Sequence, residues 1–91
     1  MTQARGTFEV LNKLGLHARA ATKLVQLASQ FPCDIVISRA GQSANAKSVM
    51  GVLLLCGSKG TVLDLEATGP QSDEAVLRIG QLIANRFGED E

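Results

Sequence analysis

Aromatic residues and unbalanced charge are both scarce in this sequence. It has no tryptophan, no tyrosine and only three phenylalanines, and nine Lys and Arg residues balance nine Asp and Glu residues. Domains that bind nucleic acids usually carry a basic excess, and proteins that bind single strands stack bases on aromatic side chains. The composition therefore argues against a nucleic-acid partner.

Long apolar runs and cysteine-rich patterns are missing as well. No segment approaches the roughly 18 apolar residues that cross a bilayer, and residues 1–5 lead into a strand-like segment without a visible signal peptide. We therefore expect a cytoplasmic protein without membrane insertion. Cys33 and Cys56 are too few for a disulfide scaffold, and we expect both to be reduced and buried. One histidine and two cysteines outside CxxC spacing do not suit a metal site, so neither a metal nor another cofactor is predicted.

The 91 residues suit a single domain, residues 1–91, because a domain typically holds about 100–200 residues. Short segments with β-type patterning predict strands at residues 7–11, 34–39, 43–45 and 61–67. Apolar residues three and four positions apart predict helices at residues 18–31, 46–55 and, after an N-cap at Ser72, 73–87. We expect the acidic residues 89–91 to be frayed.

This order is strand, helix, strand, strand, helix, strand, helix. It predicts an α+β fold with one antiparallel sheet, helices on one face and the other face toward water.

The only histidine, His17, lies directly before the first predicted helix, in the segment Gly15-Leu16-His17-Ala18-Arg19. The first amides of a helix lack intrahelical partners and attract anions. Arg19 adds a full positive charge, and it can converge with His17 if the histidine lies at or before the helix cap. A phosphoryl group on the imidazole would meet both, so His17 is a candidate nucleophile. The alternative is a histidine that only caps the helix or packs on its neighbours.

Ser48 is the second candidate, within the segment of residues 45–51 that reads NAKSVMG. It suits an N-cap of the short helix, and it also suits a regulatory phosphorylation site. A phosphate there would place negative charge beside Val49, Met50 and Leu53 and would disrupt docking if these residues form an apolar contact surface. A flexible methionine suits a surface that meets several partners. The alternative for these apolar residues is a place in the core.

The motifs at residues 15–19 and 45–51 together resemble HPr, the histidine-containing phosphocarrier of the bacterial phosphoenolpyruvate-dependent phosphotransferase system. The resemblance extends from Phe8 to about Phe87. It implies an open-faced β-sandwich, a four-stranded antiparallel sheet covered on one face by three helices. It also implies that His17 accepts a phosphoryl group on Nδ1 from phosphorylated enzyme I, that Arg19 stabilises the group, and that an EIIA-type protein receives it.

The resemblance further implies regulation and docking. In many bacteria an HPr kinase/phosphorylase modifies the serine that Ser48 matches. The implied docking surface combines the start of the first helix with the second helix, and its residues are Leu16, Ala20, Lys47, Val49, Met50 and Leu53. We expect a monomer that carries a phosphoryl group between enzymes rather than a free-standing enzyme.

Two features depart from the usual HPr pattern. Ala20 stands where the family usually has a proline, which would fix the backbone of the first helical turn, so we expect altered exchange rates rather than lost function. Residues 12–17 and 66–71 resemble NPr, the nitrogen-related branch, in which transfer serves regulation rather than sugar uptake. An NPr-type regulatory carrier and an interaction module of the same fold that transfers no phosphate therefore remain alternatives.

Overall fold

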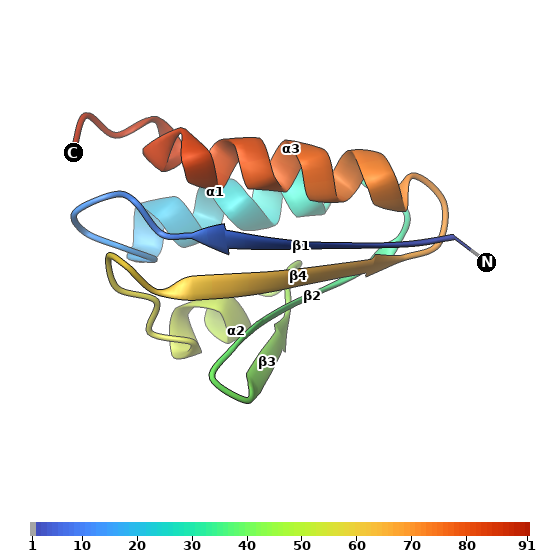
Figure 1. The fold of residues 1–91 in the computed structure, drawn as a ribbon, viewed down its shortest axis with the longest axis horizontal. Coiled ribbons are helices and arrows are strands. Elements are labelled where there is room, and N and C mark those ends of the chain that lie inside the picture. The colour runs from blue at the N-terminus through green and yellow to red at the C-terminus, as the bar shows by residue number, and fades with distance from the viewer. Residues whose placement is uncertain (1) are drawn as a thin grey trace.

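Four strands form one antiparallel sheet in the computed structural model, which describes residues 2–91 (Figure 1). In chain order they are β1 (Gln3–Glu9), β2 (Asp34–Arg39), β3 (Gln42–Asn45) and β4 (Val62–Thr68). Across the sheet the order is β1-β4-β2-β3, so the last strand lies between the first two. β2 and β3 form a hairpin, in which the chain turns through Ala40 and Gly41, both with positive φ.

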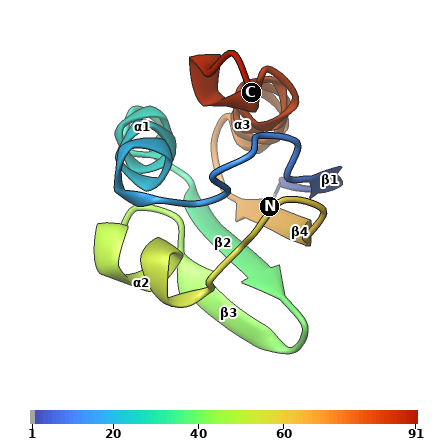
Figure 2. The ribbon, with the colours of Figure 1, turned by 90° about the vertical axis from the view of Figure 1, so that its left-hand side faces the viewer.

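Three helices cover one face of this sheet, as Figure 2 shows in a view along the strands. They are α1 (Ala18–Ala28), α2 (Val49–Leu54) and α3 (Ser72–Ala84), and a short 3-10 turn, Arg86–Gly88, follows α3. The predicted α+β fold is therefore confirmed, as is the open-faced sandwich that the resemblance implies. Within residues 2–91, none of the helices has the length and apolar character needed to cross a membrane.

The core lies between the helices and the sheet. The inward residues Leu63 and Leu65 of β4 are almost fully buried, as their alternation with Asp64 predicts. Gly80 of α3 allows the ring of Phe8 on β1 to lie directly against the helix, because a Cβ at this position would overlap the ring. This close contact joins α3 to the edge strand of the sheet.

The opposite face of the sheet is exposed and carries hydrogen-bonded polar side chains. The hydroxyl of Thr7 donates to Asp64 Oδ1 at 2.9 Å, and Arg5 pairs with Glu66 at 2.6 Å, in each case between the neighbouring strands β1 and β4. Asp64 and Glu66 thus point away from the core, and both carboxylates have surface partners.

Several helix boundaries differ from the sequence-based prediction, and the third helix, for example, ends at Ala84 rather than at residue 87. The first helix ends at Ala28 rather than at residue 31, with a turn before Pro32. The second begins only after Ser48, because the amide of Ala46 donates to Ile35 of the adjacent strand. The predicted N-cap of the third helix is wrong: Gln71 caps it in the left-handed conformation, and Ser72 is already the first helical residue.

The two cysteines are free and lie in different environments. Cys33 is buried, as expected, whereas Cys56 is exposed. The expectation that both are buried is therefore wrong for Cys56, which directly follows the C-cap of α2 with a positive φ of 53°, where the chain leaves the helix.

Candidate functional site

His17 is the N-cap residue of α1. Its backbone is extended (φ −73°, ψ 176°), and its carbonyl accepts the first helical hydrogen bond from the amide of Ala21 at 2.9 Å. Its side chain makes no capping hydrogen bond and is 26% exposed, so the imidazole is accessible at the helix start. Arg19 lies in the first turn and is exposed. This is the geometry that convergence of the two side chains requires.

The loop before His17 is held in place by backbone contacts. Gly15 has a φ of +65°, and a Cβ there would overlap the carbonyl oxygen of Gly57. The amide of Leu16 donates to that same oxygen at 2.7 Å. The glycine therefore permits both the left-handed turn and the close approach of the two chain segments. The turn at Gly15 and the contact with Gly57 together fix the point at which the helix begins and thus the position of His17.

The C-terminal segment folds over the start of α1, so the prediction that residues 89–91 are frayed is wrong. Phe87 is fully buried, and its carbonyl accepts a hydrogen bond from Lys23 Nζ at 2.6 Å. The backbone amide of Lys13 donates to a main-chain oxygen of Glu91. Figure 1 shows this segment at the same end of the molecule as the loop between β1 and α1.

Glu89 brings a carboxylate against the imidazole of His17. Glu89 Oε2 pairs with His17 Nε2, and Glu89 Oε1 accepts a hydrogen bond from Asn12 Nδ2 at 2.9 Å. Burial by itself raises the pKa of the Glu89 carboxyl. The hydrogen bonds from Asn12 and His17, with the nearby charges of His17 and Arg19, outweigh burial, so the pKa lies below its ordinary value. Glu89 is therefore ionised at neutral pH.

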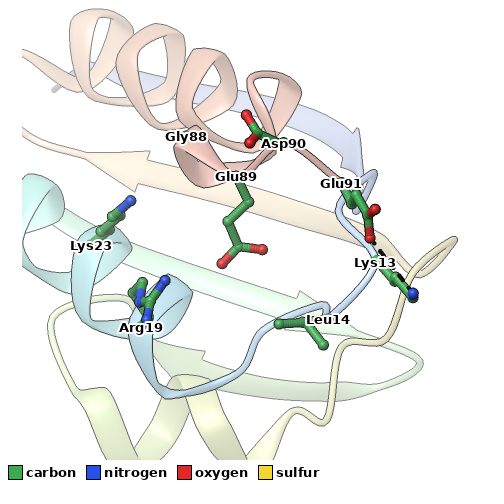
Figure 3. A pocket seen from close by; sticks show the side chains of 8 residues that line it. All are labelled: Lys13, Leu14, Arg19, Lys23, Gly88, Glu89, Asp90 and Glu91. Atoms are coloured by element: carbon green, nitrogen blue, oxygen red, sulfur yellow. Dashed lines mark ion pairs between the residues drawn. The ribbon is translucent and has the colours of Figure 1, made fainter.

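An open cavity of about 470 Å³ lies beside this pair, between the C-terminal segment and the first turns of α1 (Figure 3). The Glu89 side chain points into it from above, and Arg19 and Lys23 line it from the helix. Asp90 points away, while Glu91 pairs with Lys13 at 3.6 Å. Within residues 2–91, no three His, Cys, Asp or Glu side chains cluster closely enough to hold a metal ion.

Glu89 and Asn12 are site residues that the sequence analysis missed. Glu89 lies 72 positions from His17, in a short acidic end segment whose composition gives no sign of a contact. Asn12 is fully buried, although its segment reads as an ordinary polar turn. The glycine after Phe87 was the available signal, since it allows the chain to turn back toward α1.

Ser48 is the N-cap of α2, as one of the two interpretations predicts. Its Oγ accepts a hydrogen bond from the amide of Gly51 at 3.1 Å. The residue is half-buried. Next to it, Lys47 Nζ donates to the carbonyl of Phe31 at 2.7 Å, which links the start of α2 to the turn that follows α1. The capping role does not oppose modification, because an N-cap hydroxyl lies at the positive end of a helix.

The expected docking residues fall into two groups. Met50 is 67% exposed, and Lys47, Val49 and Leu53 are half-buried. Leu16 and Ala20 are buried, so their side chains offer little surface to a partner, and their part in docking stays a prediction.

Leu16 fills the space beside Gly57, and Ala20 belongs to the inward face of α1. Two further exposed apolar residues lie near this region: Leu54 on α2 and Leu14 in the loop before α1.

The fold and the site together define a class: an open-faced α+β sandwich that presents a single histidine at the start of a helix. A family model described as the PTS HPr component phosphorylation site matches residues 4–85. The phosphocarrier protein HPr of Cupriavidus necator is 50% identical over 82 residues, which cover 90% of this chain and 92% of that protein. The chain therefore belongs to the HPr family of the phosphotransferase system.

Two further relatives show the breadth of this similarity. The phosphocarrier protein NPr of Escherichia coli is 41% identical over 85 residues and covers 92% of this chain and 94% of its own. The crystal structure of HPr-C-His from Thermoanaerobacter tengcongensis matches with a TM-score of 0.91 and 41% identity, and it covers all of both chains. Both HPr and NPr are thus among the relatives.

Proposed function

We propose that this chain is a phosphocarrier that accepts a phosphoryl group on His17 Nδ1 from phosphorylated enzyme I and passes it to an EIIA-type protein. The observation that carries the proposal is the accessible His17 at the start of α1, whose Nε2 is paired with Glu89. This pairing leaves Nδ1 as the free ring nitrogen. Membership of the HPr family supports the same role.

The transfer is a displacement at phosphorus. The lone pair of Nδ1 attacks the phosphoryl group, the bond between phosphorus and the donor atom breaks, and its electron pair returns to the donor. The phosphoryl oxygens then lie near the free amides of the first turn of α1 and near Arg19. Each hydrogen bond to a charged group is worth roughly 1.5–3 kcal/mol. The reverse displacement, by a nucleophile of the acceptor, empties the site.

Intact-mass analysis after incubation with enzyme I and phosphoenolpyruvate tests this proposal. We expect one added phosphoryl group that acid removes and that His17→Ala abolishes. Arg19→Ala should slow the addition while leaving the melting temperature unchanged. An acid-stable adduct, or full labelling of His17→Ala, would contradict the assignment. No addition at all would favour the alternative, an interaction module of this fold that transfers no phosphate.

The branch of the phosphotransferase system is a separate question. Residues 12–17 and 66–71 resemble NPr, and E. coli NPr is among the relatives, which supports an NPr-type regulatory carrier as the second candidate. The rates of His17 phosphorylation by a sugar-type and by a nitrogen-type enzyme I distinguish the two branches. The faster donor identifies the branch to which this carrier belongs.

The proposal extends to partners and regulation. Enzyme I and the EIIA-type acceptor dock on the surface formed by Lys47, Val49, Met50 and Leu53, and an HPr kinase/phosphorylase modifies Ser48 at its edge. The exposure of Met50 supports this surface, because a flexible exposed methionine adapts to different partners. The carrier works as a cytoplasmic monomer without a cofactor. Size-exclusion chromatography with light scattering tests the monomeric state.

A further inference from the structure

We propose that Glu89 is a positioning residue that holds His17 in the tautomer with its proton on Nε2 and its lone pair on Nδ1. The inference rests on the proposed phosphoryl transfer and adds to it a residue from the C-terminal segment. Glu89 does not contact the transferred group in this scheme, because it meets the ring at the nitrogen that is not phosphorylated.

The pairing itself determines the tautomer. An ionised carboxylate can only accept hydrogen bonds, so the Nε2 atom that faces Glu89 Oε2 must be the donor. When one ring nitrogen of a neutral histidine carries the proton, the other has the free lone pair. The Glu89 side chain is only 13% exposed, so little water competes for its oxygens. In the neutral ring, which is the form that can attack phosphorus, the nucleophilic nitrogen is therefore Nδ1.

Asn12 fixes the orientation of Glu89. Asn12 Nδ2 donates to the carbonyl of Gly15 at 2.8 Å and to Glu89 Oε1 at 2.9 Å. Because both partners are acceptors, the amide atom that faces them must be the nitrogen with its two protons. Asn12 is fully buried, which holds this amide in place. Glu89 therefore has one oxygen committed to Asn12 and the other to His17.

The contact between Glu89 and His17 also stabilises the charge that the ring gains during phosphoryl transfer. When Nδ1 forms its bond to phosphorus, the donor's bond to phosphorus breaks and the electron pair stays with the donor. The proton on Nε2 remains where it is, so the ring becomes a cation. The carboxylate of Glu89 stabilises this cation from the side opposite the phosphoryl group. Loss of the carboxylate should therefore slow the transfer without removing the nucleophile.

Glu89→Gln is the sharpest variant, since it preserves the shape of the side chain. Asn12 can donate only to the oxygen of the new amide, so the NH₂ group of Gln must face His17 Nε2. The ring must then accept at Nε2 and carry its proton on Nδ1, where it blocks the nucleophile. Replacing an orienting carboxylate by its amide has this effect on other catalytic histidines. Glu89→Ala removes the preference for a proton on Nε2 but does not favour a proton on Nδ1 instead.

The test uses ¹⁵N NMR of the unphosphorylated protein, in which His17 is the only histidine and its ring signals are unambiguous. We expect the Nε2–H tautomer in the wild type, a shift to Nδ1–H in Glu89→Gln and an intermediate ratio in Glu89→Ala. The rate of phosphorylation by enzyme I should fall by roughly 10- to 100-fold in Glu89→Gln, the effect of losing a hydrogen bond to a charged group. Glu91→Gln, which alters a carboxylate of the same segment, is the matched control. It should change neither the tautomer ratio of His17 nor the rate of phosphorylation.

A wild-type ring with the tautomer ratio of a histidine in an unfolded peptide would overturn the inference. So would a Glu89→Gln variant with unchanged tautomer and rate. The NMR measurement needs no phosphoryl donor, so it tests the role of Glu89 even if enzyme I fails to label His17. Conversely, normal labelling of the wild type with no effect of Glu89→Gln would leave the proposed function intact and remove Glu89 from it.

Discussion

Ser48 can be tested for two separate roles by two substitutions. Its Oγ accepts the Gly51 amide at 3.1 Å, and α2 has no acidic residue in its first turn to favour the other free amides. Ser48→Ala removes the cap, which costs about 0.5–2 kcal/mol. In a domain of this size a loss of about 1 kcal/mol lowers the melting temperature by roughly 4–8 °C. Ser48→Asp should keep the stability, because aspartate is also a good N-cap and its charge suits a helix start.

For phosphorylation of His17 the expected order of the two variants is reversed: Ser48→Asp is the impaired variant and Ser48→Ala is not. Ser48→Asp places a negative charge beside the exposed Met50, so we expect slower phosphorylation of His17 by enzyme I. Ser48→Ala leaves the docking surface uncharged and should retain the wild-type rate. Differential scanning calorimetry measures the first effect, and the initial rate of labelling with enzyme I measures the second.

Either half of this reasoning can fail independently. If Ser48→Asp loses as much stability as Ser48→Ala, the hydroxyl does not act as a simple cap that a carboxylate can replace. If Ser48→Asp is phosphorylated at the wild-type rate, charge at this position does not reach the docking surface, and the proposed regulation is wrong.

Two further substitutions test the loop and the tail. Gly15→Ala should destabilise the protein by more than about 1 kcal/mol in urea unfolding, because it adds strain at positive φ and a clash with Gly57; Gly41→Ala, with positive φ but no neighbour within 4 Å, is the control and should cost less. Glu89→Gln should be less stable than the wild type at neutral pH. Because the pKa of Glu89 is lowered on folding, this difference is present above its ordinary value of 4.5 and lost as the pH falls through the lowered value. A stability difference between the wild type and Glu89→Gln that grows toward acid pH would contradict the lowered pKa of Glu89.

The fold could be predicted from the sequence because its signals are local and repeated. The alternation of Leu63 and Leu65 with Asp64 determines which face of β4 is buried, and the helices show clear apolar stripes. The order of the strands is a different matter. Nothing in the pattern of β4 places it between β1 and β2, because that position depends on pairing between strands far apart in the chain, and only the structure shows it.

The site could be predicted only in part, and the missing part is not local. His17 was found because a lone histidine before a helix is visible in the sequence. Glu89 was missed because an acidic residue near a chain end has no preferred partner until Phe87 is buried and the chain turns back at Gly88. Leu16 and Ala20 were assigned to docking from their positions in the motif, which say nothing of how deeply the two side chains are packed.

The position of Glu89 also separates what the family implies from what this chain adds. The family model matches residues 4–85, so Glu89 lies beyond the matched segment, whereas His17, Arg19 and Ser48 lie within it. A phosphocarrier has to give its phosphoryl group away, so its site cannot enclose the group. In the proposed transfer a carboxylate at Nε2 meets this requirement, because it orients the ring and stabilises the cation from the nitrogen that is not phosphorylated. The C-terminal segment would then support the ring on its Nε2 side and leave Nδ1 for the two successive partners of the proposed transfer.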